Sequence, residues 1–163
     1  MTANFQLVID CRDAVVLTSF WGAALGYVAE SPPAGFDSWR DWRRDAGFPE
    51  ELIDAGFPEE LVDAGVDSIV DPHGVRPRIW FRTTPESKKI KNRWHIDIHA
   101  STGGAYLTNV RNVPLEVRRQ RVDAESARLV SLGATNTGPL TDEGSSHYAV
   151  GMLDPEGNEF DIN

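Results

Sequence analysis

The chain has 163 residues, a formal net charge of −9 and a single cysteine. This length predicts one domain over residues 1–163 with a real hydrophobic core. The negative charge argues against nucleic acid as a partner, and a lone cysteine excludes an intrachain disulfide and favours a reducing, cytoplasmic location. No run approaches the ~20 apolar residues that cross a bilayer, and the N-terminus lacks a signal-peptide pattern, so we expect no membrane partner.

The chain begins with a strand, a helix and a second strand. Residues 5–11 alternate weakly between apolar and polar side chains, which indicates a strand. Asp13 is a suitable N-cap for a helix that extends to Leu25, and Gly26 stands where a left-handed residue would end that helix. Residues 27–31 predict a short strand that the following two prolines end.

A repetitive acidic segment comes next. The unit DAGFPEELI at 45–53 recurs as DAGFPEELV at 54–62, with proline near a helix start and glutamates in the first turn. Residues 37–67 contain ten acidic and three basic side chains and so carry −7 of the net −9. We predict an insert of short helices outside the core, and its role stays open between a lid and a surface elaboration.

Residues 92–100 are the most informative stretch. Trp94, Ile96 and Ile98 alternate with His95, Asp97 and His99, as in a strand with one apolar and one polar face. Three titratable side chains in a row on one face allow two interpretations. The face either meets solvent, or it forms the floor of a pocket in which imidazole and carboxylate groups converge on a ligand.

The remaining pattern repeats the first half. The stretches 68–75 and 77–85 together predict a strand, the turn Asp71-Pro-His-Gly and another strand, and the turn Asp154-Pro-Glu-Gly separates two later strands at 147–153 and 159–163. A helix over 114–132 and a strand over 134–140 precede this second turn. On that helix we expect a solvated basic face with Arg118, Arg119, Arg121 and Arg128, and an apolar face with Val122, Leu129, Val130 and Leu132.

This order is a duplication, strand–helix–strand–strand–strand in each half. It predicts an α+β fold with two βαβββ modules, module one at 5–85 with the insert at 37–67 and module two at 92–163. Because neither half can bury its sheet alone, we expect the modules to form one curved, cup-shaped mixed sheet with the helices on its convex side.

Four motifs in this order resemble the vicinal oxygen chelate superfamily, which includes glyoxalases, bleomycin-resistance proteins and extradiol dioxygenases. They are FWGAALGY (20–27), NRWHIDIH (92–99), RLVSLGAT (128–135) and DPEGNEF (154–160). They are distributed over the whole chain except the insert, and the run from 85 to 97 resembles the glyoxalase-like domains most. The resemblance implies the two-module cup, but it leaves the function open because the fold carries metal enzymes and metal-free binders alike.

The resemblance also implies positions for metal ligands. They fall on Gln6, His95 and Asp161, and the position seen in glyoxalases on the fourth strand falls near Trp80 or Arg82, neither of which is a metal ligand. An amide oxygen, an imidazole and a carboxylate suit a weakly held divalent metal ion and not a strong zinc site. A metal cofactor therefore stays one option.

Strand alternation predicts which side chains face the cup and which face the helices. The cup side should contain Gln6, Asp10, Trp80, Arg82, His95, Asp97, His99 and Asp161. The helix side should contain Leu7, Ile9, Ile79, Phe81, Trp94, Ile96, Phe160 and Ile162. We expect Asp10, Trp80, Arg82, Asp97 and His99 to bind substrate; Arg82 either holds a ligand carboxylate or pairs with Asp97 or Asp161.

Two functions stay open. One is an enzyme of lyase, isomerase or dioxygenase type that acts on a small polar organic ligand, with His95 as metal ligand or general base. The other is a metal-free drug-binding module of the bleomycin-resistance kind without catalysis. The incomplete ligand set favours binding and the polar strand favours chemistry, while the sequence leaves homodimer formation open.

Overall fold

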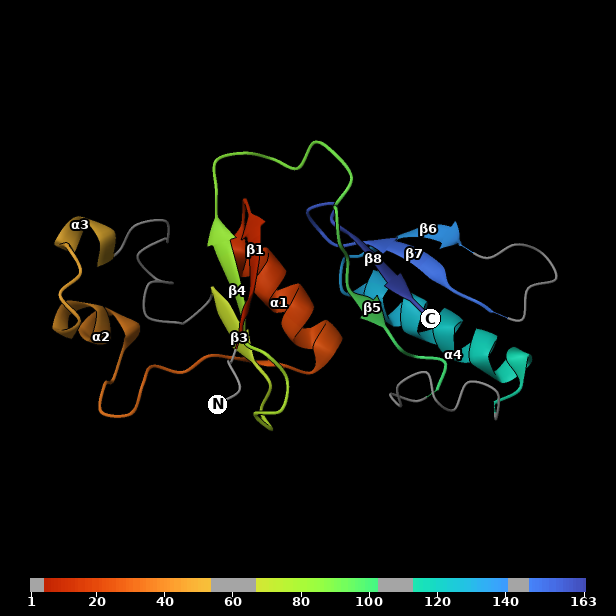
Figure 1. The fold of residues 1–163 in the computed structure, drawn as a ribbon, viewed down its shortest axis with the longest axis horizontal. Helices are drawn as coiled ribbons and strands as arrows, with labels where there is room; N and C mark the ends of the chain where they lie inside the picture. Colours follow the sequence, from red (N-terminus) through yellow and green to blue (C-terminus); the bar gives the residue numbers. More distant parts are fainter. Residues whose placement is uncertain (1–4, 54–66, 103–112, 141–146) are drawn as a thin grey trace. The chain divides into compact units, whose positions relative to one another are not determined.

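The computed structural model describes residues 5–53, 67–102, 113–140 and 147–163. The chain divides into two compact units, Met1–Ser87 and Lys88–Asn163, here called the first and second unit (Figure 1). Each unit contains one four-stranded sheet among its described residues. No helix in those ranges is both long enough and apolar enough to cross a membrane.

The first unit is a βαβββ module. Its elements are β1 (Leu7–Cys11), α1 (Ala14–Leu25), β2 (Val28–Ala29), β3 (Ser68–Val70) and β4 (Ile79–Thr83). The sheet order is β1-β4-β3-β2, with β1 parallel to β4 and the other pairs antiparallel. Helix α1 packs against β2, β3 and β4, so that Leu17 and Phe20 are buried together with Ile79 and Phe81. The predicted alternation of β4 is therefore confirmed.

The second unit repeats this arrangement. Its elements are β5 (Asp97–Ile98), α4 (Leu115–Ser131), β6 (Thr135–Pro139), β7 (Val150–Leu153) and β8 (Glu159–Ile162). The sheet order is β5-β8-β7-β6, with β5 parallel to β8. Helix α4 packs against β6, β7 and β8, and Phe160 and Ile162 are buried beneath it. The predicted α+β fold with two βαβββ modules is confirmed, while their union into one cup stays a prediction.

Local signals end the elements where the sequence predicts. The carboxylate of Asp13 accepts a hydrogen bond from the backbone N–H of Val16 at 3.1 Å, and Gly26 ends α1 with φ of 69°. In both units the aspartate of the DPxG turn is buried, and its side chain accepts several backbone N–H groups. The two turns, at Asp71 and Asp154, are thus the same structure in both modules.

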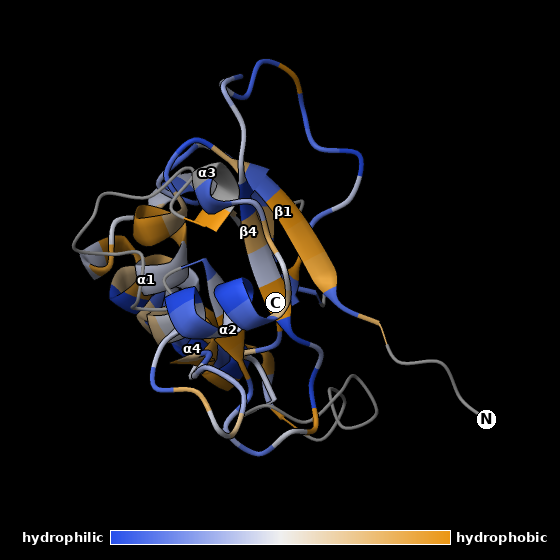
Figure 2. Cartoon of the chain, turned by 90° about the vertical axis from the view of Figure 1, so that its left-hand side faces the viewer, coloured by the Kyte–Doolittle hydropathy of each residue, from blue (hydrophilic) through white to orange (hydrophobic). Residues whose placement is uncertain are grey.

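The insert begins as the predicted short helices. Helix α2 (Trp39–Asp45) is capped by Ser38 and is largely hydrophilic (Figure 2), and α3 (Glu50–Ile53) packs against it. The indoles of Trp39 and Trp42 meet edge to face, 5.4 Å between ring centroids. The second copy of the repeat, at 54–62, lies outside the described residues.

The predicted strand over 92–100 is wrong in length. Only β5 forms, and Trp94, expected under the helix, is 53% exposed. The cause is the partner strand: with Asp97 opposite Asp161 in parallel register, residues before 95 would lie opposite the turn that precedes Glu159. The chain therefore has no strand to pair with until it reaches β8.

The predicted faces of α4 are wrong in part. Arg118, expected in solvent, is buried, and its Nε donates to the carbonyl oxygen of Val113 at 3.1 Å. Val122 and Leu129 are buried as predicted, while Val130 and Leu132 are exposed. The buried stripe follows the helical spacing 118, 122, 126 and 129, and Val130 lies beyond its edge, about 100° around the helix from Leu129.

Candidate functional site

Three side chains with metal-ligand chemistry converge in the second unit where β5 pairs with β8. Nδ1 of His95 lies 2.9 Å from Oδ1 of Asp97 and 3.4 Å from Oδ2 of Asp161. One ligand atom from each of the three residues lies within 4.8 Å of the others. The parallel register places Asp97 beside Asp161, so the backbone pairing itself brings the carboxylates together. We call these three residues the His95 cluster.

The carboxylate of Asp161 is partly buried, and its pKa is raised. The Asp161 side chain is 25% exposed, against 39% for His95. Burial raises the pKa of the Asp161 carboxyl; His95 acts in the opposite direction, the charge of Asp97 raises this pKa further, and Lys91 lowers it. Because the net shift is upward, the ionised carboxylate is held at a cost that a nearby cation would reduce.

A chain of hydrogen bonds holds Asp97 from the side away from His95. His99 contacts the Asn163 side-chain oxygen through its Nδ1, and Nδ2 of Asn163 donates to Oδ2 of Asp97 at 3.2 Å. One carboxylate oxygen of Asp97 is therefore fixed by an amide, while the other points at His95. This arrangement orients a ligand side chain in the way that hydrogen bonds behind metal sites usually do.

The segment before β5 is fastened to β8 by one carboxylate. Oε2 of Glu159 accepts hydrogen bonds from the Lys88 ammonium at 2.9 Å and from the backbone N–H of Asn92 at 3.0 Å. Burial acts to raise the pKa of the Glu159 carboxyl, but these hydrogen bonds outweigh it and lower the pKa to about 2. Along β8, Glu159 and Asp161 alternate with the buried Phe160 and therefore share one face.

Gln6, the predicted first-strand ligand, lies in the first unit. Its side-chain oxygen accepts a hydrogen bond from Nη1 of Arg78 at 2.7 Å. Arg78 also pairs with Glu30 at 2.7 Å, and the same glutamate accepts the hydroxyl of Ser68 at 2.9 Å. These side chains thus satisfy one another within the first unit.

The other predicted residues of the first unit are also paired. Nε and Nη2 of Arg82 donate to the two oxygens of Asp10 at 2.7 and 3.0 Å, and this hydrogen bonding raises the pKa of Arg82. The indole N–H of Trp80 donates to Asp67 at 3.1 Å. Within the first unit, the partner of Arg82 is therefore the aspartate opposite it on β1.

The structure thus brings together four predicted residues of the second unit, His95, Asp97, Asp161 and, through Asn163, His99. Sequence reasoning assigned Asp97 to substrate binding, but its carboxylate is nearer to the imidazole of His95 than that of Asp161 is. It also missed Asn163. The alternation of β8 contained the signal, since 161 and 163 have the same parity as residues on the polar face.

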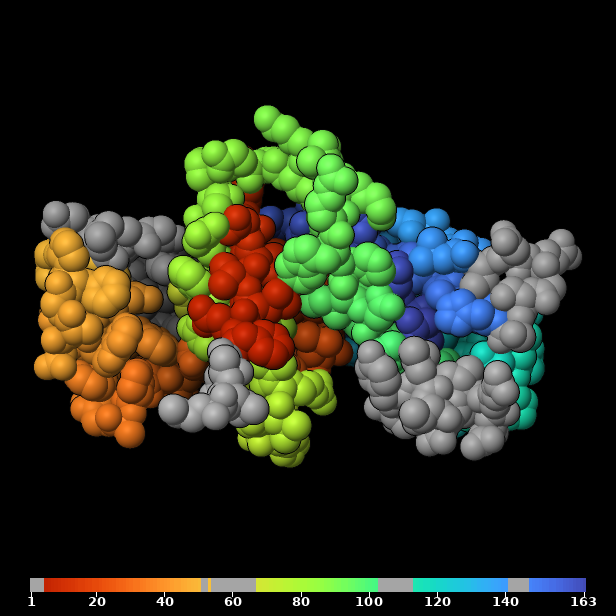
Figure 3. Space-filling model, in the orientation of Figure 1, coloured from red at the N-terminus to blue at the C-terminus, as the bar shows by residue number. Residues whose placement is uncertain are grey.

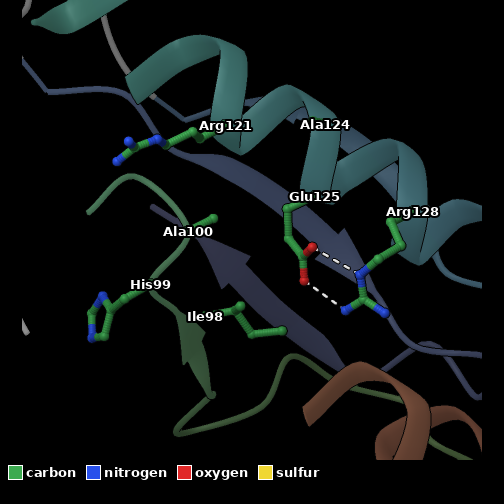
Figure 4. A pocket seen from close by; sticks show the side chains of 7 residues that line it. All are labelled: Ile98, His99, Ala100, Arg121, Ala124, Glu125 and Arg128. Carbon is green, nitrogen blue, oxygen red and sulfur yellow. Dashed lines mark hydrogen bonds and ion pairs between the residues drawn. The ribbon is translucent and has the colours of Figure 1, made fainter. Parts of the chain in front are cut away.

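A separate cavity of about 650 Å³ lies in the second unit between the end of β5 and α4 (Figure 4). It is lined by Ile98, His99, Ala100, Arg121, Ala124, Glu125 and Arg128. Arg128 binds both oxygens of Glu125 at 2.7 and 2.8 Å, and Arg121 donates to the Ser101 carbonyl at 3.0 Å. None of the residues of the His95 cluster lines this cavity.

The donor set of the His95 cluster suits a divalent metal ion. One imidazole nitrogen and two carboxylate oxygens match the ligands of manganese, iron or magnesium sites, whereas a structural zinc site prefers thiolates. Ligand atoms at adjacent positions of an octahedral ion are about 3 Å apart, close to the 2.9 and 3.4 Å seen from His95. The raised pKa of Asp161 supplies the electrostatic reason to take up a cation.

A family model described as glyoxalase-like domain matches residues 6–163. The fold is similar to a glyoxalase/bleomycin resistance protein/dioxygenase family enzyme from Burkholderia phytofirmans PsJN, at 18% identity over 99% of this chain and 98% of that one, with a TM-score of 0.52. It is also similar to the fosfomycin resistance protein FosX from Listeria monocytogenes, at 9% identity over 99% and 92%, with a TM-score of 0.54. A FosX variant complexed with Mn(II) and 1S,2S-dihydroxypropylphosphonic acid matches at 10% identity over 100% and 90%, with a TM-score of 0.52. No curated protein matches the sequence.

From the raised pKa of Asp161 we predict how the stability of the folded protein changes with pH. The folded protein holds this proton more tightly than the unfolded chain, so stability falls as pH rises from 3.8 through the folded pKa. Asp161→Asn removes the charge and should raise Tm at pH 7 without metal by a few degrees, on the order of 1 kcal/mol. The gain should vanish below pH 3.8. Asp37→Asn is the control, and equal pH profiles for the two variants would contradict the assignment.

Glu159 should behave in the opposite sense. Its folded pKa of about 2 lies below the ordinary value of 4.5, so its contribution to stability is present above pH 4.5 and is lost as pH falls towards 2. We expect Glu159→Gln to lose about 1–2 kcal/mol at pH 7, after allowance for solvent screening. Chemical denaturation between pH 2.5 and 7 measures this loss, with the exposed Glu86→Gln as control. A loss independent of pH would refute the ionic origin.

Proposed function

Because the chain belongs to the glyoxalase-like domain family of the vicinal oxygen chelate superfamily, we propose that it is a metal-dependent enzyme. Its substrate is a small, oxygen-rich organic molecule, and the reaction is of the lyase, isomerase or dioxygenase type. The divalent ion is held by the His95 cluster in the second unit.

One observation carries this proposal: an imidazole and two carboxylates place ligand atoms within 4.8 Å of one another. A solvated sheet face would gain nothing from gathering two aspartates, since like charges at this distance repel. The FosX variant solved with Mn(II) has a similar fold, which supports metal use on this architecture. In this chain the donors come from one unit alone, without Gln6, whose oxygen is bonded to Arg78.

The residues of the His95 cluster and their neighbours have distinct roles. When bound, the metal ion would act as a Lewis acid on a substrate oxygen. His95 and Asp161 would hold it, and Asp97 would provide the third donor. Asn163 keeps one oxygen of Asp97 engaged, so that the other stays directed at the cluster. His99 acts through Asn163 as a positioning residue.

The metal-free binding module is the weaker candidate. In such a module the polar residues of the first unit would hold the ligand, but Arg82 is already neutralised by Asp10 and Trp80 donates to Asp67. A general-base role for His95 needs no metal, yet it does not account for the second carboxylate beside the imidazole. The convergence of donors therefore favours the metal enzyme.

Calorimetric titration with Mn(II) tests the proposal. Wild type should bind one ion, and His95→Ala and Asp161→Asn should each weaken binding at least about tenfold, since each removes a ligand. His73→Ala is the matched control, because that exposed histidine lies on the first DPxG turn, outside the cluster. Circular dichroism spectra should show that every variant is folded. Equal affinities for wild type and His95→Ala would refute the assignment of the metal site.

A further inference from the structure

The cavity between β5 and α4 has the size and the lining of a site for a small organic molecule. Its volume of about 650 Å³ falls within the ~300–1,000 Å³ of most ligand pockets. Part of its lining is apolar and consists of Ile98, Ala100 and Ala124. Arg121, Ala124 and Arg128 are exposed, and the stretch that contains β5 (green in Figure 3) lies at the surface. The cavity is therefore open to solvent.

Backbone hydrogen bonds hold the wall of the cavity that follows β5. The N–H groups of Ala100 and Ser101 both donate to the main-chain oxygen of Asn163, at 2.8 and 3.0 Å. These bonds attach the wall to the residue that follows β8. The shape of the wall is therefore set before any ligand binds, and a preformed site loses less conformational freedom on binding.

The charged side chains around the cavity do not cancel. Arg128 donates to both oxygens of Glu125, so these two charges neutralise each other. Arg121 donates to the carbonyl oxygen of Ser101, which is a neutral acceptor, and no carboxylate of the described residues forms an ion pair with it. With a neutral imidazole at His99, two arginines and one glutamate leave the lining with one net positive charge.

Arg121 is placed to receive an anion. Its bond to the carbonyl of the buried Ser101 uses Nη1 and fixes the guanidinium in one position. In Figure 4 the guanidinium extends away from the Glu125–Arg128 pair, towards the side on which His99 lies. A guanidinium has five N–H donors, and a carboxylate fits two neighbouring ones in a bidentate pair. A phosphate monoester carries about −1.5 to −2 at pH 7, which exceeds the one charge that the lining offers.

We propose that this cavity binds a small organic acid with one carboxylate and an apolar body. The carboxylate pairs with Arg121, and the apolar body lies against Ile98, Ala100 and Ala124. The single net positive charge of the lining selects a monoanion, and the apolar wall selects a molecule with a hydrocarbon part.

This site is distinct from the proposed metal site. No residue of the His95 cluster lines the cavity, so binding there needs no metal and does not rest on the proposed function. His99 lies between the two sites: it lines the cavity, and it contacts Asn163, which donates to Asp97 of the cluster. A ligand in the cavity would therefore touch a positioning residue of the cluster without touching a metal ligand.

Titration of sodium benzoate into the full chain tests this inference, after dialysis against EDTA and with NMR detection of the backbone amides. The signals of Ala100 and Ser101 should shift and saturate with a Kd on the order of 1–10 mM, as for a fragment of this size. Benzyl alcohol, the uncharged analogue, should bind at least about threefold more weakly, and Arg121→Gln should weaken benzoate binding about 3–10-fold. Arg119→Gln is the matched control, because Arg119 lies on the same helix and does not line the cavity.

Two tryptophan substitutions test the location of the site. Ala124→Trp fills the cavity and should weaken benzoate binding about tenfold or more, whereas Ala127→Trp should change the Kd by less than about twofold. Both alanines are exposed on α4, and only Ala124 lines the cavity. Circular dichroism should show that both variants are folded. No saturable shift in wild type, or equal affinities for wild type and Ala124→Trp, would overturn the inference.

The metal-free protein keeps this test separate from the metal proposal. Benzoate binding that Ala124→Trp abolishes supports the cavity site whether or not the protein takes up Mn(II). Benzoate binding that occurs only after Mn(II) is added would assign the carboxylate to the metal, which supports the metal proposal and overturns the cavity site. Equal affinities of wild type and Arg121→Gln for benzoate would overturn the assignment of an organic acid as the ligand.

Discussion

The parallel pairing of β5 with β8 is the constraint on which the candidate site depends. Because Asp97 lies opposite Asp161, the two carboxylates are neighbours by backbone register and not by side-chain choice. His95 enters two residues before Asp97 and brings its Nδ1 between them. A shift of this register by one residue would turn one of the aspartates to the apolar side, where Phe160 and Ile162 are buried against α4.

Two carboxylates on the same face of β8 differ in how well their negative charge is neutralised. Glu159 is neutralised by Lys88 and by a backbone N–H, and its pKa is low. Asp161, two residues on, has no comparable set of donors among the residues that the structure describes, and its pKa is raised. A protein selected for stability alone would have replaced Asp161 by an amide or an apolar residue. The contrast between these two carboxylates supports the proposal that Asp161 binds a cation.

Much of the fold could be predicted from the sequence because its signals are local. The cap at Asp13, the left-handed Gly26 and the two DPxG turns depend on a few adjacent residues, and they mark the duplication. The length of β5 could not be predicted, since it is set by where β8 begins, more than 60 residues later. Likewise, the bond between Arg82 and Asp10 follows from the pairing of β1 with β4, which no local pattern contains.

At the site, alternation along 95–99 identified the correct strand face, and the resemblance supplied His95 and Asp161. What it did not supply was the third donor: the ligand set expected from the resemblance spans both units, whereas the converging atoms lie in one. Asp97 lies beside Asp161, and Asn163 contacts Asp97, only because of the register in which β5 pairs with β8. Long-range strand pairing therefore determines which residues form the cluster, whereas the sequence alone identifies only candidate residues.

Anomalous X-ray diffraction from crystals grown with Mn(II), recorded on both sides of the manganese absorption edge, would locate a metal ion bound by the His95 cluster. We expect one anomalous peak within bonding distance of Nδ1 of His95 and of carboxylate oxygens of Asp97 and Asp161. A peak at another position, or none at a Mn(II) concentration that saturates the protein in solution, would contradict this assignment.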